Sequence, residues 1–248
     1  MSFKIVIPAR YASTRLPGKP LADICGKPMI VRVAEQAAIT GAEIIIATDS
    51  VKVFDVAKAH GFYAVMTNIN HVSGTDRIAE VVKKMGWADS EIVVNVQGDE
   101  PLISPMLIKE VAENLANHNQ ADIATACHSL HLEADFLNPH IVKVILDKAS
   151  YANYFSRAPI PFPRDGLNQA KPIQAMRHIG IYAYRAAFLN TYANLTPAPT
   201  EQLESLEQLR ALWHGYKISV AVIDNAPASG VDTQADLARV REIFASLG

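Results

Sequence analysis

Residues 5 to 20 read Ile5-Val6-Ile7-Pro8-Ala9-Arg10-Tyr11-Ala12-Ser13-Thr14-Arg15-Leu16-Pro17-Gly18-Lys19-Pro20. The apolar start predicts a short strand that ends at Pro8, because proline has no N–H group to donate to a sheet ladder. Arg10, Arg15 and Lys19 follow on a loop, at the strand end where an open α/β sheet binds its ligands. Three cations on one loop repel each other unless an anion neutralises them. We therefore predict a loop that binds a nucleoside triphosphate; the alternative is a solvated basic turn.

Strand and helix patterns alternate along the first half of the chain. The strand patterns cover residues 4–7, 43–48, 62–66, 91–96 and 123–126, and the helix patterns cover residues 29–40, 51–60, 75–85 and 105–115. Gly41, Gly61 and Gly86 follow the first three helices, where glycine commonly ends a helix. Ser104 and Pro105 suit the N-cap and first position of the fourth. This order predicts an α/β fold, a Rossmann-like open and mostly parallel sheet flanked by helices.

The pattern changes in the second half of the chain. Strand patterns over residues 141–146 and 178–184 enclose a segment rich in proline and aromatic residues, 151–172. Long irregular segments in compact domains are usually lids or binding surfaces. We predict a single domain over residues 1–248, in which roughly residues 147–185 form a smaller inserted arm for contact with a partner subunit and for substrate binding.

The C-terminal part carries three further patterns. Leucines at every third position predict one helix over residues 201–213 with a core-facing stripe, and residues 217–223 have the pattern of a strand. Thr233 and Asp236 form a capping box for a last helix.

Composition narrows the class of protein. Half of the 248 residues are apolar, which is enough for a sizeable core. The net charge of −2 provides no basic field, so we expect no nucleic-acid partner. Apolar runs are too short for a membrane span, and the N-terminus has no secretion-signal pattern. We expect a cytoplasmic protein without a membrane partner.

A carboxylate stands where the triphosphate would lie. Asp99, in the run Gln97-Gly98-Asp99-Glu100-Pro101, follows a buried strand and so lies at the same sheet edge as the cationic loop. Mg²⁺ is held by one or two carboxylates together with phosphate oxygens. Asp99 is therefore a candidate magnesium ligand; an Asx-type turn is the alternative.

A second loop offers backbone donors to a ligand. His71-Val72-Ser73-Gly74-Thr75-Asp76-Arg77 lies between a strand and a helix start, where free N–H groups and small residues allow a close approach. An ordinary helix cap by Thr75 is compatible with this role.

Six segments, in order along nearly the whole chain, resemble the signatures of one family of nucleotide-activated sugar synthases. The cationic loop resembles R-x-x-S-[ST]-R-L-P-x-K, and residues 71–77, 97–101, 154–157, 177–182 and 206–210 resemble H-x-S-G-T-[ED]-R, Q-G-D-E-P, Y-F-S-R, R-H-x-G-I-Y and L-E-Q-L-R. The chain is similar to the 3-deoxy-manno-octulosonate (Kdo) cytidylyltransferases, the CMP-Kdo synthetase family. Asp76 stands where glutamate is more usual.

The resemblance implies a fold of the nucleotide-diphospho-sugar transferase type and a Mg²⁺-dependent reaction. CTP and Kdo would be the substrates, and CMP-Kdo for lipopolysaccharide biosynthesis and pyrophosphate the products, in a homodimeric enzyme. In addition to Asp99, the family has a second metal carboxylate. Asp232, in Gly230-Val231-Asp232-Thr233, occupies its position. Thr233 is the better helix cap, which leaves Asp232 available.

The resemblance also assigns roles residue by residue. The expected catalytic residues are Arg10, Arg15, Lys19 and Asp99. The expected nucleotide-binding residues are Pro8, Ala9, Arg10, Ser13, Thr14, Arg15, Lys19, Ser73, Gly74, Thr75, Arg77, Gln97 and Gly98. The expected sugar-binding residues are Gln97, Arg157, His178, Tyr182 and Glu207. For this last set, structural ion pairs, core packing and a solvated helix face are the alternatives.

Four other functions are weighed against this one. Another nucleotidyltransferase could use 8-amino-Kdo, a sialic acid or a sugar 1-phosphate as acceptor. A dinucleotide oxidoreductase or a P-loop NTPase is disfavoured, because the chain has neither G-x-G nor G-x-x-x-x-G-K-[ST]. A non-catalytic CTP-binding protein would tolerate the loss of one metal carboxylate, whereas both are present.

Overall fold

The computed structural model describes residues 1–12, 15–71, 73–167 and 174–247. The strands are β1 (Lys4–Ala9), β2 (Asp23–Ile24), β3 (Lys27–Pro28), β4 (Glu43–Thr48), β5 (Tyr63–Met66), β6 (Ile92–Asn95), β7 (Ile123–Leu130), β8 (Lys143–Leu146), β9 (Ala152–Ser156), β10 (Ala175–Arg185) and β11 (Ile218–Val222). The helices are α1 (Met29–Ala38), α2 (Val51–Ala59), α3 (Gly74–Met85), α4 (Pro105–Asn117), α5 (Glu133–Leu137), α6 (Ala186–Tyr192), α7 (Pro199–Glu204), α8 (Gln208–Trp213) and α9 (Gln234–Leu247), with a 3-10 turn, η1 (Lys19–Leu21).

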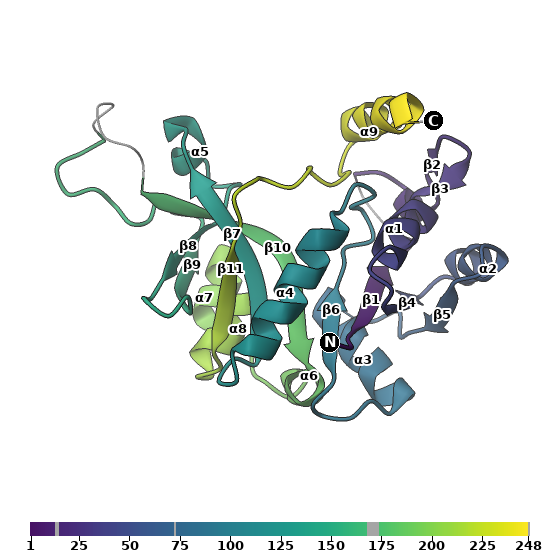
Figure 1. Cartoon of the computed structure of the whole chain (residues 1–248), viewed down its shortest axis with the longest axis horizontal. Helices are drawn as coiled ribbons and strands as arrows, with labels where there is room; N and C mark the ends of the chain where they lie inside the picture. The colour runs from purple at the N-terminus through teal and green to yellow at the C-terminus, as the bar shows by residue number, and fades with distance from the viewer. Residues whose placement is uncertain (13–14, 72, 168–173, 248) are drawn as a thin grey trace.

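The main sheet has the strand order β11-β7-β10-β6-β1-β4-β5 (Figure 1). Neighbouring strands are parallel except around β10, which runs antiparallel to β6 and to β7. β8 pairs with β10 and β9 with β8, off this path. The predicted fold class is confirmed. After β5, the chain returns past β1 to form β6, so the strand order reverses beside β1, which is the position where doubly wound sheets bind ligands.

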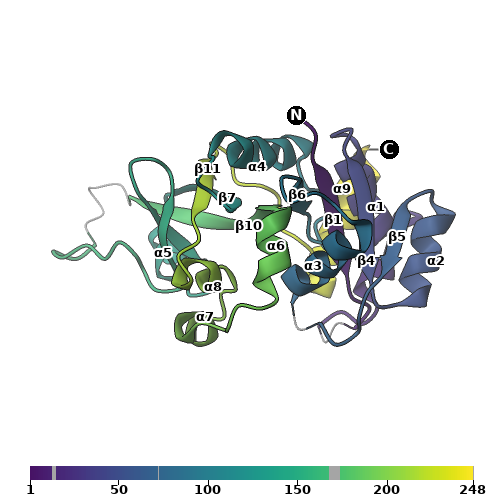
Figure 2. The ribbon, with the colours of Figure 1, turned by 90° about the horizontal axis from the view of Figure 1, so that it is seen from below.

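Helices cover both faces of the sheet. Ile5 and Ile7 face the layer that contains α1 and α4, whereas Val6 faces the layer that contains α3 and α6. This alternation follows from the two-residue period of a strand. Figure 2 shows α4 on one side of β6 and β10 and α3 and α6 on the other. The two apolar layers fix the carboxyl ends of β1 and β6 side by side.

Helix ends follow the predicted stops closely. α3 ends at Met85 and is capped by Gly86, which adopts a left-handed conformation with φ of +63°. None of the helices in the described ranges combines the length and apolar composition that crossing a bilayer would require.

Strand β1 is longer than predicted, because it continues through Pro8 to Ala9. Pro8 and Ala9 pair with Ala47 and Thr48 of β4, while pairing with β6 stops at Val6. In a parallel ladder, residues two apart direct their backbone groups to the same neighbour. Pro8 therefore directs its backbone toward β6, as Val6 does. Because pairing with β6 stops at Val6, the missing N–H group of Pro8 costs no hydrogen bond of the ladder.

The predicted helix over residues 201–213 is two helices, α7 and α8. Ser205 separates them with φ of +51°. The break has a tertiary cause: the Glu204 carboxylate accepts hydrogen bonds from Ser156 Oγ at 2.9 Å and from the Arg157 N–H at 2.6 Å. As a result Leu203, predicted to face the core, is 86% exposed.

The predicted arm, 147–185, contains strands of the main sheet at both ends. β9 lies within the part that was expected to be irregular, and β10 lies between β6 and β7. Residues 157–167, between these strands, extend away from the body of the molecule (Figure 1). Contact with a partner subunit through this segment stays a prediction.

Candidate active site

The loops that follow β1 and β6 meet at the carboxyl edge of the sheet. Gly98 is needed for this contact, because a Cβ atom at this position would lie 2.8 Å from the Pro8 carbonyl oxygen. Gly18, with φ of +67°, turns the cationic loop into η1, which begins at Lys19. The predicted loop and the predicted carboxylate are thus adjacent.

Lys19 connects the two predicted metal carboxylates. Its ammonium nitrogen lies 2.5 Å from Asp99 Oδ2 and 3.1 Å from Asp232 Oδ1, and it donates to the Val231 carbonyl oxygen at 2.8 Å. Arg15 Nη2 contacts the same Asp232 oxygen at 2.9 Å. Two carboxylates from distant parts of the chain therefore converge on one cationic position.

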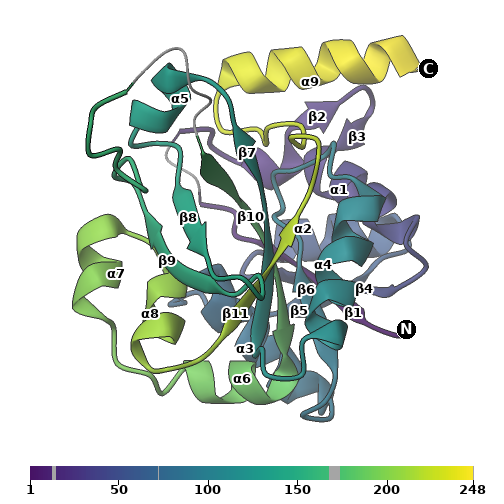
Figure 3. The same ribbon diagram turned by 60° about the vertical axis from the view of Figure 1, so that its left-hand side comes forward.

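The C-terminal segment brings Asp232 to this position. The Val231 N–H donates to the Asp99 carbonyl oxygen at 2.8 Å, and a Cβ atom on Gly230 would lie 3.2 Å from that oxygen. Helix α9 then packs against the hairpin of β2 and β3 (Figure 3), where Arg241 Nε donates to the Asp23 carbonyl oxygen at 2.9 Å. Because β2 and β3 belong to the N-terminal half, α9 joins both ends of the chain at the site.

The start of α9 is capped as the sequence predicts. Thr233 Oγ1 accepts from the Asp236 N–H at 3.2 Å, and Asp236 Oδ2 accepts from the Thr233 N–H at 2.9 Å. Hydrogen bonds from Thr233 lower the pKa of Asp236. The capping box leaves the Asp232 carboxylate free to face Lys19.

Two adjoining cavities open at this edge, with volumes of about 320 Å³ and about 460 Å³. We call them the loop cavity and the β10 cavity. The loop cavity is lined by Pro8, Ala9, Arg10, Ala12, Arg15, Lys19, Pro20, His71, Ser73, Gly74, Arg77, Gln97, Gly98, Asp99, Glu207 and Asp232. This set contains most of the predicted nucleotide-binding residues. Ser13 and Thr14 lie outside the described residues.

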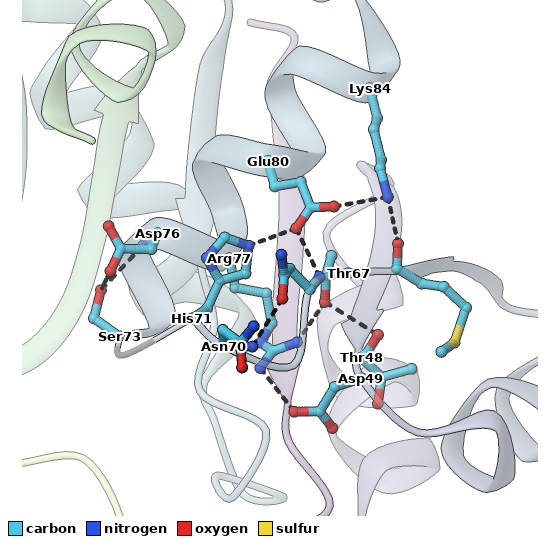
Figure 4. A network of polar contacts seen from close by, with 12 residues as sticks. Thr48, Asp49, Thr67, Asn70, His71, Ser73, Asp76, Arg77, Glu80 and Lys84 are labelled. Carbon is cyan, nitrogen blue, oxygen red and sulfur yellow. Dashed lines mark hydrogen bonds and ion pairs between the residues drawn. The ribbon is translucent and has the colours of Figure 1, made fainter. Parts of the chain in front are cut away.

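Arg77 lines the loop cavity but is held by protein partners. Its Nη2 atom contacts Asp49 Oδ2 at 2.9 Å, and its Nη1 atom donates to Thr67 Oγ1 (Figure 4). Its charge is therefore balanced within the protein. Arg15 also contacts a carboxylate, that of Asp232, but its side chain is exposed, as is that of Arg10. Arg77 fixes the wall of the cavity through the ends of β4 and β5.

Beside Arg77, His71 also lines the loop cavity. Its Nε2 atom lies 2.5 Å from Glu80 Oε2, which also accepts from the Asn68 N–H at 2.8 Å (Figure 4). Lys84 contacts the other Glu80 oxygen at 2.7 Å. Burial acts to raise the pKa of Glu80, but hydrogen bonds from Asn68, Lys84 and His71 outweigh it and lower the pKa to about 2. This network was not predicted, because it joins Asn68 and His71 of the loop after β5 to Glu80 and Lys84 of α3.

The β10 cavity contains three of the predicted sugar-binding residues, Gln97, Tyr182 and Glu207. Glu207 Oε2 accepts from Thr75 Oγ1 at 3.1 Å, which links the start of α3 to the residue before α8. Burial raises the pKa of the Glu207 carboxyl, against the effect of this hydrogen bond. Burial and the neighbouring Asp99 raise the pKa of Glu100, another lining residue, to about 7.

Sequence reasoning missed several polar residues in the same cavity. They are Asn95, Tyr184, Tyr192 and Gln208. Asn95 carried one detectable signal, since it is a polar residue at the end of the otherwise apolar run Ile92–Asn95. The other three match the ordinary patterns of strands and helices.

The other two predicted sugar-binding residues line neither cavity. The Arg157 guanidinium donates to the carbonyl oxygens of Glu204, Pro139 and Ser205. The His178 ring lies between Phe155 and Tyr182, and its Nε2 atom is 3.0 Å from Thr125 Oγ1. Their assigned role in sugar binding stays a prediction.

The donor set suits magnesium. Asp99 and Asp232 offer hard carboxylate oxygens beside exposed cations, and Mg²⁺ is usually held by one or two protein carboxylates and phosphate oxygens. No group of three or more His, Cys, Asp or Glu side chains in the described ranges is placed to hold a metal ion by itself.

Comparison with known proteins identifies the family of this chain. The family model described as "Cytidylyltransferase" matches residues 4–218. A solved CMP:2-keto-3-deoxy-manno-octonic acid synthetase complexed with CTP superposes with a TM-score of 0.91 at 42% identity, over 100% of both chains. A cytidylyltransferase from Leptospira borgpetersenii serovar Hardjo-bovis superposes with a TM-score of 0.59 at 17% identity, over 100% of this chain and 95% of the other, which shows the shared fold alone. This chain belongs to the cytidylyltransferase family and, within it, to the CMP-Kdo synthetases.

Proposed function

We propose that this nucleotidyltransferase transfers CMP from CTP to the anomeric hydroxyl group of Kdo, with Mg²⁺ held by Asp99 and Asp232. One observation carries the proposal: the two cavities share Asp99 and Asp232 as lining residues. A nucleotide in one cavity and an acceptor in the other would meet at these carboxylates. Such an arrangement suits a direct transfer between two bound substrates.

The loop cavity suits the nucleotide. Arg10 and Arg15 are exposed cations beside Lys19, and together they can balance the charge of a triphosphate. Ser73 is the N-cap of α3, and its hydroxyl oxygen accepts from the Asp76 N–H at 3.1 Å. Ser73 and Gly74 line the loop cavity, so this helix start can offer backbone N–H groups to a ligand there. The β10 cavity suits the acceptor, since Gln97, Tyr182 and Glu207 can hydrogen-bond hydroxyl groups.

The reaction forms a bond from the anomeric oxygen to the α-phosphorus of CTP and breaks the bond from that phosphorus to the bridging oxygen of pyrophosphate. Bound Mg²⁺ would neutralise phosphate charge and make the attacking hydroxyl group easier to deprotonate. Lys19 holds Asp99 and Asp232 together, and Arg10 and Arg15 stabilise the negative charge that develops on the leaving pyrophosphate. Positioning and charge balance supply the catalysis, as in other transfers at phosphorus.

The test is a pyrophosphate-release assay that crosses CTP, UTP, ATP and GTP with Kdo, 8-amino-Kdo and a sialic acid, each with Mg²⁺ or with EDTA. We expect turnover with CTP, Kdo and Mg²⁺. Greater turnover with a sialic acid or with 8-amino-Kdo would show that this sugar, and not Kdo, is the preferred acceptor. Full turnover in EDTA would overturn the role of the metal.

We further propose that the enzyme is a cytoplasmic homodimer that supplies lipopolysaccharide biosynthesis, with residues 157–167 at the dimer contact. Phe162 in this segment is 73% exposed, and large exposed apolar side chains favour association. Light scattering on Phe162→Asp and on the unchanged chain tests the contact. A dimer that withstands the substitution at low micromolar concentration would place the interface elsewhere.

A further inference from the structure

Strands β1, β4 and β5 end level with one another, because Thr48 pairs with Ala9 on one side and with Met66 on the other. Asp49, the residue after β4, is therefore placed between the cationic loop, which follows β1, and the segment after β5 that leads to α3. Residues of both segments line the loop cavity, whereas Asp49 lines neither cavity. Asp49 is thus a carboxylate beside the site that does not form part of its lining.

Asp49 contacts both segments through its two oxygen atoms. Its Oδ1 atom accepts from the Tyr11 N–H of the cationic loop at 3.2 Å. Its Oδ2 atom lies 2.9 Å from Arg77 Nη2, in the first turn of α3 (Figure 4). Tyr11 follows Arg10 in the chain, and both Arg10 and Arg77 line the loop cavity. One carboxylate therefore joins the main chain next to one lining arginine to the side chain of another.

The contact between Asp49 and Arg77 is buried, since their side chains are 10% and 3% exposed. A buried ion pair adds little net stability compared with apolar packing, because the cost of desolvation offsets the attraction. Removing one partner is costly, however, because it leaves an unpaired buried charge. The pair therefore accounts for a fixed arrangement of these two residues better than it accounts for stability.

Arg77 keeps N–H donors for a ligand. Within the described ranges its guanidinium contacts Asp49 through Nη2 and Thr67 Oγ1 through Nη1. These contacts use two of the five N–H groups of an arginine side chain. Thr67 is held in turn, because its Oγ1 atom donates to the Thr48 carbonyl oxygen at 3.0 Å. The guanidinium is therefore oriented before a ligand arrives, which lowers the entropic cost of binding.

We propose that Asp49 is a positioning residue for the nucleotide, which holds the Arg77 guanidinium and the cationic loop at Tyr11 in the arrangement that binds CTP. The inference rests on the proposed function, in which the nucleotide occupies the loop cavity, and extends it to a residue outside the lining. The contacts of Asp49 in the described part of the chain go to Tyr11 and Arg77, not to the Asp99 or Asp232 carboxylates. Loss of Asp49 should therefore weaken nucleotide binding more than it slows the chemical step.

Asp49→Asn tests this role. An asparagine side chain can still accept from the Tyr11 N–H, but its NH2 group cannot accept from Arg77, so the substitution breaks chiefly the ion pair. We expect Kd and KM for CTP to rise by about 10-fold or more, while kcat at saturating CTP changes by less than about threefold. Isothermal titration with CTP and Mg²⁺ measures Kd, and pyrophosphate release measures KM and kcat.

Thr67→Val is a milder second variant, because it removes the Nη1 acceptor and keeps both the ion pair and the net charge. It should raise Kd for CTP by about threefold.

A double-mutant cycle shows whether Asp49 acts through Arg77. Arg77→Met alone should weaken CTP binding, and the addition of Asp49→Asn should weaken it little further. Additive losses would overturn the inference, because Asp49 would then act by another route. The double variant has no unpaired buried charge at this pair, so its comparison with Arg77→Met, together with Thr67→Val, carries the test if Asp49→Asn does not fold.

Glu201→Gln is the matched control. Glu201 Oε1 forms a similar buried ion pair with Arg210 Nη2 at 2.6 Å, and neither residue lines a cavity. This variant should have a lower melting temperature and an unchanged Kd for CTP. The same result in Asp49→Asn would overturn the inference. Failure of the proposed function is a separate result: the unchanged protein would then release no pyrophosphate from CTP and Kdo, while Kd for CTP would still be measured.

Discussion

Val231 and Asp99 are joined through their main chains, because the Val231 N–H donates a 2.8 Å hydrogen bond to the Asp99 carbonyl oxygen. This bond fixes the next residue, Asp232, where its carboxylate contacts Lys19. The site is therefore complete only when the segment before α9 has docked on the loop after β6. Catalysis and the packing of the C-terminal helix are coupled by this geometry.

Asp99→Asn and Asp232→Asn should each lower kcat/KM by at least about 100-fold, because each removes one of the two carboxylates available to the metal. Pyrophosphate release over a Mg²⁺ titration measures the effect, and circular dichroism checks that the fold persists. Asp55→Asn, on the exposed side of α2, is the control for loss of one negative charge. An undiminished rate in either site variant would remove that carboxylate from the proposed mechanism.

Lys19→Met should destabilise the metal-free protein by about 1–3 kcal/mol, since it leaves two neighbouring carboxylates without their shared cation. The effect is limited because the Asp99 and Asp232 side chains are 31% and 46% exposed, so water solvates them in part, and Arg15 still contacts Asp232. Thermal melts with and without Mg²⁺ provide the measurement. Added Mg²⁺ should raise the melting temperature of the variant more than that of the unchanged protein.

The outcome that contradicts this prediction is an equal Mg²⁺-dependent shift in both proteins. In that case the two carboxylates do not form one cation site. Lys27→Met serves as the control, because Lys27 also contacts a carboxylate, that of Glu35, but lies away from the cavities.

Gly98→Ala should raise KM for CTP and lower stability, because the new methyl group would lie 2.8 Å from the Pro8 carbonyl oxygen. Backbone must then move at the junction of the two loops that line the loop cavity. Gly180→Ala is the control for stability: a Cβ atom there meets no heavy atom within 4 Å. Chemical denaturation and CTP saturation curves measure the two effects. Equal stability of the two variants would show that the loops can separate without cost.

Local signals in the sequence were enough to predict most of the fold. The apolar run of β1 and the left-handed Gly86 after α3 depend on residues close in the chain. The break between α7 and α8 does not, because it depends on contacts between Glu204 and β9. Contacts of this kind override helical periodicity and leave no trace in it.

The residues of the candidate site also fall into two groups, those that could be predicted from the sequence and those that could not. Lys19 and Asp99 follow the ends of parallel strands, so topology alone brings them to one edge. Gln208 lies on the short helix α8 after the break, and Tyr192 lies on the short helix α6 before it. Their patterns do not distinguish a buried unpartnered group from ordinary packing. Arg157 shows the reverse problem, because it matches a motif yet binds backbone carbonyl groups outside the cavities.

Stability should fall as the pH drops below about 6.5, because packing against Phe155 and Tyr182 favours the neutral form of the half-buried His178 ring. Burial lowers the pKa of His178 from 6.5 to about 3. A folded-state pKa below the unfolded value means that the unfolded chain binds the proton first, so stability is full above pH 6.5 and declines between pH 6.5 and 3. One such group contributes at most about 1.4 kcal/mol per pH unit in this window.

Urea denaturation at pH 7.5, 6.5, 5.5 and 4.5 measures the decline, and His178→Gln should make it shallower. His60→Gln is the control, since His60 is exposed at the end of α2. An identical pH profile in His178→Gln and the unchanged protein would mean that His178 reaches water before the chain unfolds.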